Sequence, residues 1–105
     1  MVPATFETEM EVQKLLKTRE GGETEVETPA GFADLLTDKH VIEIRHVIDW
    51  KDGVKVLVYA QYFPGWQPRI HLFGGYAPAF RALVEEATKN LGIVVTWESE
   101  PYKQL

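Results

Sequence analysis

The stretch "GFADLLTDKHVIEIRHV", residues 31–47, constrains the fold more than any other part of the chain. Two runs rich in β-branched and apolar residues are separated there only by a short polar tip, which predicts a β-hairpin. A symmetrical tip centred between Asp38 and Lys39 fixes the register so that Asp34 lies opposite Glu43. The hairpin therefore holds two carboxylates face to face, about 5 Å apart at Cβ, among apolar neighbours.

Two opposed carboxylates repel each other unless a cation or a shared proton lies between them. A half-buried pair of hard oxygen ligands suits Mg²⁺, which typically binds one or two carboxylates and keeps several waters. An ordinary cross-strand salt bridge accounts for the same spacing if Asp34 pairs with Arg45 or Lys39 and Glu43 is solvated. The spacing alone leaves both interpretations open.

The rest of the chain reads as helices and strands, which gives the order αβββαβαβ. Thr8 and Glu11 form a capping box that predicts a helix over residues 8–19, and an alternating stretch predicts a strand over 23–28. The later predicted elements are a helix capped by Asp49 and ended by Pro64-Gly65, an antiparallel or edge strand "PRIHLFGG", a helix starting at Pro78, and a last strand "IVVTW".

The composition limits the classes of protein that the chain can represent. With 105 residues, 45% of them hydrophobic, residues 1–105 are predicted to form a single domain with its own core. The net charge of -5 argues against binding nucleic acid by bulk charge, so any contact with phosphate must be local. Cysteine is absent, which excludes thiolate metal sites. Without an apolar run of about 18 residues or an export signal, we expect a cytoplasmic protein with no membrane partner.

The acids and the element order resemble the PD-(D/E)XK phosphodiesterase superfamily, which includes restriction endonucleases and Holliday-junction resolvases. Its signature is an aspartate early in one strand, followed in the next strand by a glutamate, an apolar residue and a lysine. The corresponding residues here are Asp34 and then Glu43-Ile44-Arg45. The order αβββαβ over residues 8–74 resembles the family core. The resemblance implies an α/β, restriction-endonuclease-like fold with a mixed central sheet flanked by helices.

This chain departs from the family pattern at two positions. Ala33 stands where many members have a proline, which changes little. Arg45 stands at the lysine position, and an arginine stays protonated, so it cannot act as a general base although it can stabilise a pentavalent phosphate. Lys55 aligns with a position in the next helix where related nucleases carry a glutamine or a relocated lysine. Lys55 either enters the site or faces solvent on an amphipathic helix.

The resemblance also implies a set of metal ligands. Asp34, Glu43 and the Ile44 carbonyl would hold Mg²⁺ or Mn²⁺, while Lys55, Arg45 or both orient the attacking water or neutralise developing charge.

A glutamate from the first helix lies near the metal in this family, and the candidates are Glu7, Glu9 and Glu11. Glu11 already completes the capping box, which favours Glu9. All three acids would equally suit a helix N-terminus, where the macrodipole favours negative charge.

The function implied by the resemblance is a small Mg²⁺-dependent endonuclease that hydrolyses DNA phosphodiester bonds. Cutting both strands with so small a domain requires two copies, so we expect a homodimer or a larger symmetric homo-oligomer. The expected basic rim consists of Lys39, Arg45, Lys51, Lys55 and Arg69.

One aromatic residue is a candidate contact for the nucleic acid. Trp66 lies in the loop "PGWQPR" beside Arg69, where it could stack on a nucleotide or cover the core.

Two other classes of function remain open. One is a catalytically inactive module that keeps the nuclease fold for nucleic-acid binding or assembly, which Arg45 favours. The other is a small-molecule-binding or structural α/β domain, which the negative net charge favours.

Overall fold

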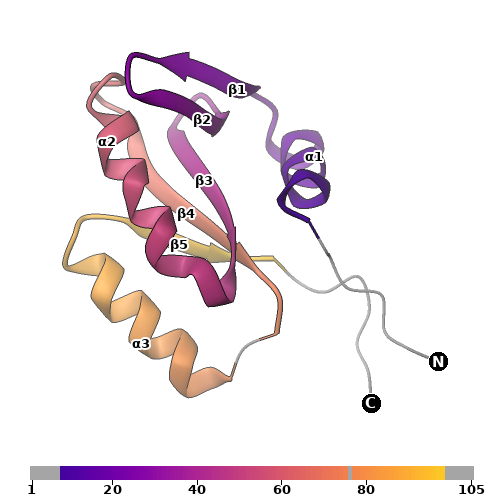
Figure 1. Cartoon of the computed structure of the whole chain (residues 1–105), viewed down its shortest axis with the longest axis vertical. Helices are drawn as coiled ribbons and strands as arrows, with labels where there is room; N and C mark the ends of the chain where they lie inside the picture. Colours follow the sequence, from indigo (N-terminus) through magenta and orange to yellow (C-terminus); the bar gives the residue numbers. More distant parts are fainter. Residues whose placement is uncertain (1–7, 76, 99–105) are drawn as a thin grey trace.

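The computed structural model describes residues 8–75 and 77–98, and its elements follow one another in the predicted order (Figure 1). The helices are α1 (Glu9–Glu20), α2 (Val56–Ala60) and α3 (Pro78–Lys89), and a 3₁₀ helix, η1 (Val47–Lys55), leads directly into α2. The strands are β1 (Glu23–Thr28), β2 (Gly31–Leu36), β3 (His40–His46), β4 (Gln67–Phe73) and β5 (Val94–Trp97). No helix in this described part of the chain has the length and apolar character that a membrane span requires.

The strands form one mixed sheet in the order β1-β2-β3-β4-β5. β1, β2 and β3 are antiparallel neighbours, whereas β3, β4 and β5 run parallel. Leu35 pairs with Ile42 and Leu36 pairs with Val41, which confirms the predicted hairpin register. The predicted α/β class with a mixed sheet is therefore confirmed.

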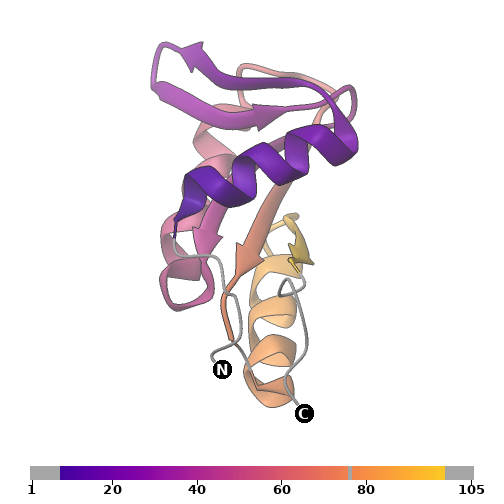
Figure 2. The same ribbon diagram turned by 90° about the vertical axis from the view of Figure 1, so that its right-hand side faces the viewer.

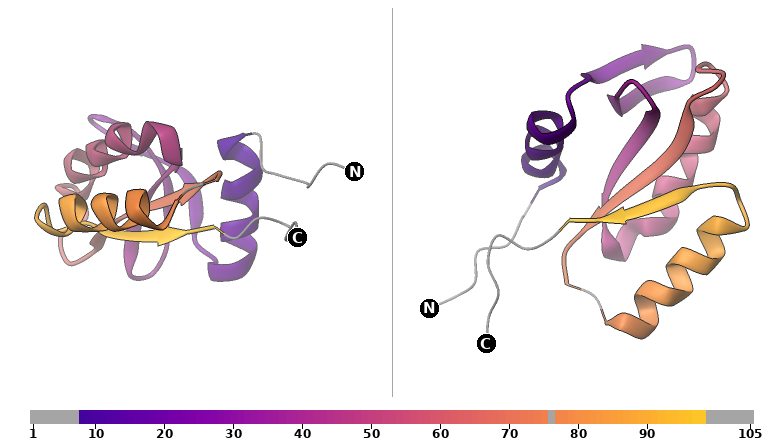
Figure 3. Two further views of the ribbon diagram at one scale, coloured as in Figure 1. Left: turned by 90° about the horizontal axis from the view of Figure 1, so that it is seen from below. Right: turned by 180° about the vertical axis from the view of Figure 1, so that it is seen from behind.

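Helices cover both faces of this sheet. α1 packs across β1, β2 and β3 on one face, while η1, α2 and α3 pack on the opposite face (Figures 2 and 3). Two apolar clusters fill these layers, one under α1 and one under the other helices. The cluster under α1 contains Val12, Leu16, Leu35, Ile42, Ile44 and Phe73. The opposite cluster includes Val41, Val56, Tyr59, Ile70, Leu72 and Val84.

β4 is not the antiparallel or edge strand that its alternating sequence predicted, because it lies inside the sheet and is parallel to both neighbours. Ile70 and Leu72 are buried on the α2 side, as an alternating strand requires. Arg69 and His71, however, are only 5% and 2% exposed. Alternation predicts one polar face but does not reveal that other polar groups cover that face.

The segment after β3 was predicted as one helix capped by Asp49, and this detail is wrong. Asp49 has non-helical φ and ψ of -101° and 26°, and the cap is His46, whose Nδ1 accepts a hydrogen bond from the Ile48 amide at 3.1 Å. The imidazole satisfies a helix N-terminal amide as a capping side chain does. The helix therefore starts earlier and its first part is 3₁₀.

Gly53 lets this helical segment lie close to the sheet. A Cβ atom at Gly53 would come within 2.8 Å of the Ile70 Cγ2 atom. A glycine that weakens a helix in isolation is thus required here by close packing, which holds the segment carrying Lys55 beside β3 and β4.

Candidate functional site

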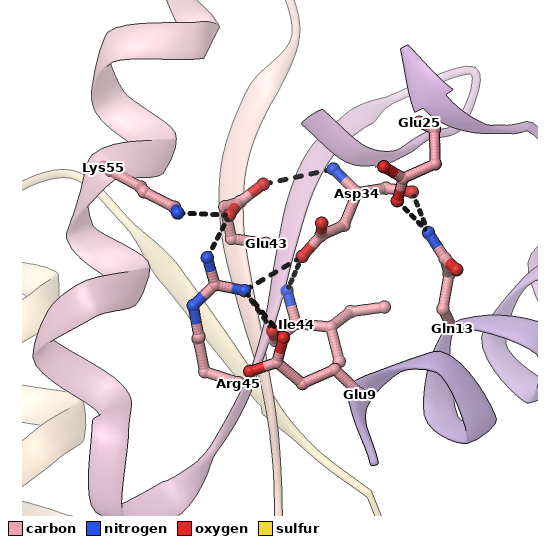
Figure 4. Close-up of polar contacts among 8 residues, drawn as sticks. All are labelled: Glu9, Gln13, Glu25, Asp34, Glu43, Ile44, Arg45 and Lys55. Carbon is pink, nitrogen blue, oxygen red and sulfur yellow. Dashed lines mark hydrogen bonds and ion pairs between the residues drawn. The ribbon is translucent and has the colours of Figure 1, made fainter. Parts of the chain in front are cut away.

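The two acids of the hairpin face each other where the β2–β3 ladder ends (Figure 4). The Asp34 amide donates to Glu43 Oε2 at 3.1 Å, and the Ile44 amide donates to Asp34 Oδ2 at 2.8 Å. Each carboxylate therefore satisfies a backbone amide of the other strand in place of a ladder carbonyl. This exchange fixes the orientation of both side chains and explains why two acids interrupt a buried hairpin.

The guanidinium of Arg45 lies among these acids. Its Nη1 donates to the Ile44 carbonyl at 2.6 Å, to Asp34 Oδ2 at 3.2 Å and to Glu9 Oε1 at 3.3 Å. Its Nη2 donates to Glu43 Oε1 at 3.0 Å. The oxygens for which the sequence predicted a shared metal ion therefore converge on one cation, and in this structure that cation is Arg45 (Figure 4).

α1 brings Glu9 into this group. The Thr8 amide donates to Glu11 Oε1 at 3.0 Å and the Glu11 amide donates to Thr8 Oγ1 at 3.2 Å, so the predicted capping box is confirmed. Glu11 is engaged at the cap, whereas Glu9, the first residue of the helix, reaches Arg45. Glu7 lies outside the described residues. We call Glu9, Asp34 and Glu43 the acid cluster.

The acid cluster holds more negative charge than its protein cations balance. Burial and then the neighbouring Asp34 charge raise the pKa of Glu43 to about 7. Burial also raises the pKa of Asp34 and that of Glu9, in spite of the nearby Arg45 charge. Lys55 contributes weakly, because its Nζ lies 4.0 Å from Glu43 Oε1 on a half-exposed side chain. Burial is the largest cause of each raised pKa, and the charges of Arg45 and Lys55 offset it only in part.

The donor atoms fit Mg²⁺ or Mn²⁺ in chemistry, since they are carboxylate and carbonyl oxygens. With the guanidinium among them, no group of three or more His, Cys, Asp or Glu side chains in residues 8–75 and 77–98 is placed to hold a metal ion. The oxygens of Asp34, Glu43 and Ile44 would thus hold a divalent ion only if Arg45 withdrew.

A basic pocket lies beside the acid cluster on the α2 side. Its volume is about 640 Å³, and it is lined by Arg45, Lys51, Asp52, Val54, Lys55, Leu57 and Val58. Three cationic side chains and one carboxylate border it, so it favours an anion. Lysine and arginine are the side chains that bind phosphate groups in proteins. The structure therefore brings together three of the five residues of the expected basic rim, Arg45, Lys51 and Lys55.

A smaller acidic pocket of about 280 Å³ lies on the α1 side, lined by Glu9, Met10, Gln13, Glu25 and Asp34. Sequence reasoning missed Gln13, whose Nε2 donates to the Asp34 carbonyl and to Glu25 Oε2, both at 2.8 Å. The helical spacing of Gln13, four residues after Glu9, is the signal that could have placed it on the same face of α1.

Lys39 and Trp66 are not brought to the site. The Lys39 carbonyl accepts a hydrogen bond from the Gln67 amide at 2.9 Å, and Trp66 Nε1 donates to the Thr37 carbonyl at 2.7 Å. Lys39 precedes β3 and Trp66 precedes β4, where the two parallel strands start side by side, about 20 Å along β3 from Arg45 at about 3.3 Å per residue. Trp66 anchors a loop against the hairpin tip and remains 36% exposed.

Arg69 does not join the basic rim, because it is buried within a second polar group on the α1 side of the sheet. Its Nη1 and Nη2 donate to Glu20 Oε1 and Oε2, both at 2.8 Å, and its Nε donates to Thr96 Oγ1 at 2.9 Å. We call the group the ion-pair cluster, and its members are Arg19, Glu20, Arg69, His71, Thr96 and Glu98.

Comparisons with known proteins identify partial relatives. KilA-N domain-containing protein L33 of Acanthamoeba polyphaga mimivirus, so named, is 38% identical over 66 residues, which are 62% of this chain and 27% of that protein. The similarly named protein R878 of the same virus is 36% identical over 63 residues, which are 59% of this chain and 18% of that protein. No family model matches the chain, and no solved structure matches it. The matched part thus spans about a quarter or less of each of these relatives.

Proposed function

We propose that this chain is a small metal-dependent endonuclease domain of the PD-(D/E)XK type, which hydrolyses phosphodiester bonds in DNA. One observation carries the proposal. The oxygens of Asp34, Glu43 and Ile44 converge on a single cation, and a pocket bordered by Arg45, Lys51 and Lys55 lies directly beside them. A phosphodiesterase needs this combination of an anionic metal site and a cationic phosphate site.

DNA as the substrate is supported by the partial relatives. They are named for a KilA-N domain, and KilA-N domains are a DNA-binding family. The matched segments cover a minor part of those proteins. The relation therefore supports DNA as the partner, and the proposal of hydrolysis rests on the residues of the site alone.

In this proposal, the basic pocket receives the scissile phosphate. Lys51 and Lys55 would bind its oxygens, and Arg45 would offer a planar pair of donors that matches a phosphate. Asp34, Glu43 and the Ile44 carbonyl would hold Mg²⁺ or Mn²⁺, which supplies an activated water and polarises the phosphate.

The two candidate cations differ in what they can do during hydrolysis. Lys55 would orient the attacking water with its ammonium group, whereas the planar guanidinium of Arg45 would neutralise charge on the phosphate oxygens. Lys55 is also well placed for this role, since its ammonium group lies between the basic pocket and Glu43. We therefore assign orientation of the water to Lys55 and charge neutralisation to Arg45.

A plasmid-nicking assay with and without Mg²⁺ or Mn²⁺ tests this proposal. Asp34→Asn and Glu43→Gln keep the size of each side chain, and we expect each to lower metal-dependent nicking by about 100-fold or more. Glu86→Gln on the exposed surface of α3 is the matched control and should leave nicking unchanged. Absence of metal-dependent nicking by the unaltered protein would refute the proposal.

A second candidate function is non-catalytic binding of DNA by the same fold. The position of Arg45 favours it, because a permanent guanidinium takes the place of a metal ion among the acids. In that case fluorescence anisotropy should show DNA binding that weakens about tenfold in a Lys51→Met, Lys55→Met double variant, while no metal supports nicking. The predicted homo-oligomer follows only from cutting both strands, so it belongs to the first candidate.

A further inference from the structure

Arg45 belongs to two neighbouring environments of opposite charge. It borders the basic pocket together with Lys51 and Lys55. All of its hydrogen bonds in the structure, however, go to the other side, to Glu9, Asp34, Glu43 and the Ile44 carbonyl. The side chain that would bind a phosphate is thus held by the oxygens that would bind a metal ion.

A divalent ion and the guanidinium exclude each other at this position. Mg²⁺ binds oxygens at about 2.0–2.1 Å, so an ion held by Asp34, Glu43 and the Ile44 carbonyl would lie within a few ångströms of Arg45. Two positive charges at that separation, at a site that is 9% exposed at Arg45 and 1% exposed at Glu43, repel strongly. Metal binding therefore requires the guanidinium to leave.

The basic pocket is open space that Arg45 already borders, so it is the nearest place for the guanidinium once it leaves the acids. Lys51 and Lys55 already border this pocket, so a third cation is unfavourable there without an anion. A phosphate diester in the pocket reverses this balance, because it offers the guanidinium two oxygens in bidentate geometry.

We propose that Arg45 is a substrate-operated gate for the metal site: without DNA it occupies the acid cluster, and a backbone phosphate in the basic pocket draws it out and admits the divalent ion. This inference rests on the proposed function and adds an order of binding to it. DNA and the metal ion then bind cooperatively, and each strengthens the other by the same factor. The gate prevents the free protein from holding a reactive metal centre.

The competing interpretation is that Arg45 is a fixed counter-ion that never leaves the acids. The two interpretations differ in whether DNA and the divalent ion bind cooperatively. A gate competes with the metal ion, so removing the guanidinium strengthens metal binding even in the absence of DNA, and DNA strengthens metal binding to the unaltered protein. A fixed counter-ion never leaves the acids, so DNA and the divalent ion do not strengthen each other in the unaltered protein.

The test measures Mn²⁺ binding to the full chain without DNA, by the loss of the electron paramagnetic resonance signal of the free ion. We expect Arg45→Met to bind Mn²⁺ at least about tenfold more tightly than the unaltered protein. Arg81→Met on the surface of α3 is the control for loss of an arginine and should bind like the unaltered protein. Equal or weaker Mn²⁺ binding by Arg45→Met would overturn the gate.

A second arm measures cooperativity by the anisotropy of a labelled DNA duplex, with and without Ca²⁺ as a divalent ion of lower catalytic power. The unaltered protein should bind the duplex about 5-fold or more tightly with Ca²⁺, and Arg45→Met should lose most of this gain. A gain of the same size in both proteins also contradicts the gate.

A third variant keeps the test decisive if Arg45→Met does not fold, as circular dichroism would show. Arg45→Lys retains the charge but lacks the planar guanidinium, and we expect it to bind Mn²⁺ more tightly than the unaltered protein. Failure of the gate and failure of the nuclease proposal give different results. Nicking without tighter Mn²⁺ binding removes the gate alone, whereas tighter Mn²⁺ binding without nicking removes the nuclease alone.

Discussion

The ion-pair cluster and the acid cluster both bury charged groups against the sheet, but they satisfy them differently. In the ion-pair cluster each glutamate has its own arginine: Arg69 donates to both oxygens of Glu20, and Arg19 donates to both oxygens of Glu98 at 3.1 and 2.9 Å. In the acid cluster, three carboxylates share the guanidinium of Arg45 and only a distant ammonium group besides.

The pKa values follow this difference in partners. The hydrogen bonds from Arg69 lower the pKa of Glu20, and those from Arg19 and His71 lower the pKa of Glu98 although its burial opposes them. Burial, followed by the Asp34 charge, raises the pKa of Glu43 to about 7. Burial opposes ionisation at both residues, and the hydrogen bonds from Arg19 and His71 outweigh it at Glu98. In the ion-pair cluster each carboxylate has an arginine of its own, whereas the three carboxylates of the acid cluster outnumber the cations beside them.

The largest effect on stability should come from removing Arg69 from the ion-pair cluster. Arg69→Met removes a buried guanidinium and its hydrogen bonds to Glu20 and Thr96, so we expect the free energy of unfolding to fall by about 2 kcal/mol, measured by urea denaturation. The control is Arg81→Met, which breaks an exposed pair with Glu85 and should cost about 1 kcal/mol or less. If both variants lose the same amount, the ion-pair cluster does not stabilise the fold as argued.

Glutamate-to-glutamine substitutions sharpen the comparison, because the two clusters should respond with opposite signs. The pKa of Glu43 is raised from 4.5 to about 7, so its contribution to stability is present at low pH and is lost as the pH rises through about 7. At pH 8 without divalent ions, Glu43→Gln should therefore raise the free energy of unfolding by about 1 kcal/mol.

Glu20→Gln is the matched control for that measurement. The pKa of Glu20 is lowered, so its charged form stabilises the fold at pH 8 and the substitution should reduce the free energy of unfolding by about 1 kcal/mol. Loss of stability in both variants would mean that the acid cluster is as well balanced as the ion-pair cluster.

Sequence reasoning succeeded where the signals are local. The capping box of Thr8 and Glu11 set the start of α1, and the short polar tip of the hairpin set the register that brings Asp34 opposite Glu43. Each of these features depends on residues a few positions apart. The acids of the candidate site were therefore predictable before any coordinates.

The failures involve groups that meet from distant parts of the chain. Arg69 alternates with apolar residues in β4, as a solvent-facing strand residue does. Only the fold shows that Glu20, 49 positions earlier, covers it. His71 likewise meets Glu98, 27 positions later. The sequence pattern also predicted a cation between the acids but could not show that the chain supplies it through Arg45. Periodicity gives the face of a strand, and it does not give the partner on that face.

The smallest predicted effect concerns His71 and tests whether the ion-pair cluster tolerates added charge. Burial lowers the pKa of His71, and the charges of Arg69 and Arg19 act in the same direction, while its Nε2 contact with Glu98 at 2.9 Å opposes them. A lowered histidine pKa means that its contribution to stability is present above about 6.5 and is lost as the pH falls. The free energy of unfolding should thus decrease between pH 7 and pH 5, by less than about 1 kcal/mol. Glu43 changes stability in the opposite direction over this range, so the measurement belongs in a Glu43→Gln background. There, His71→Gln should remove most of the decrease, and an unchanged pH dependence would show that His71 takes up its proton equally in the folded and the unfolded protein.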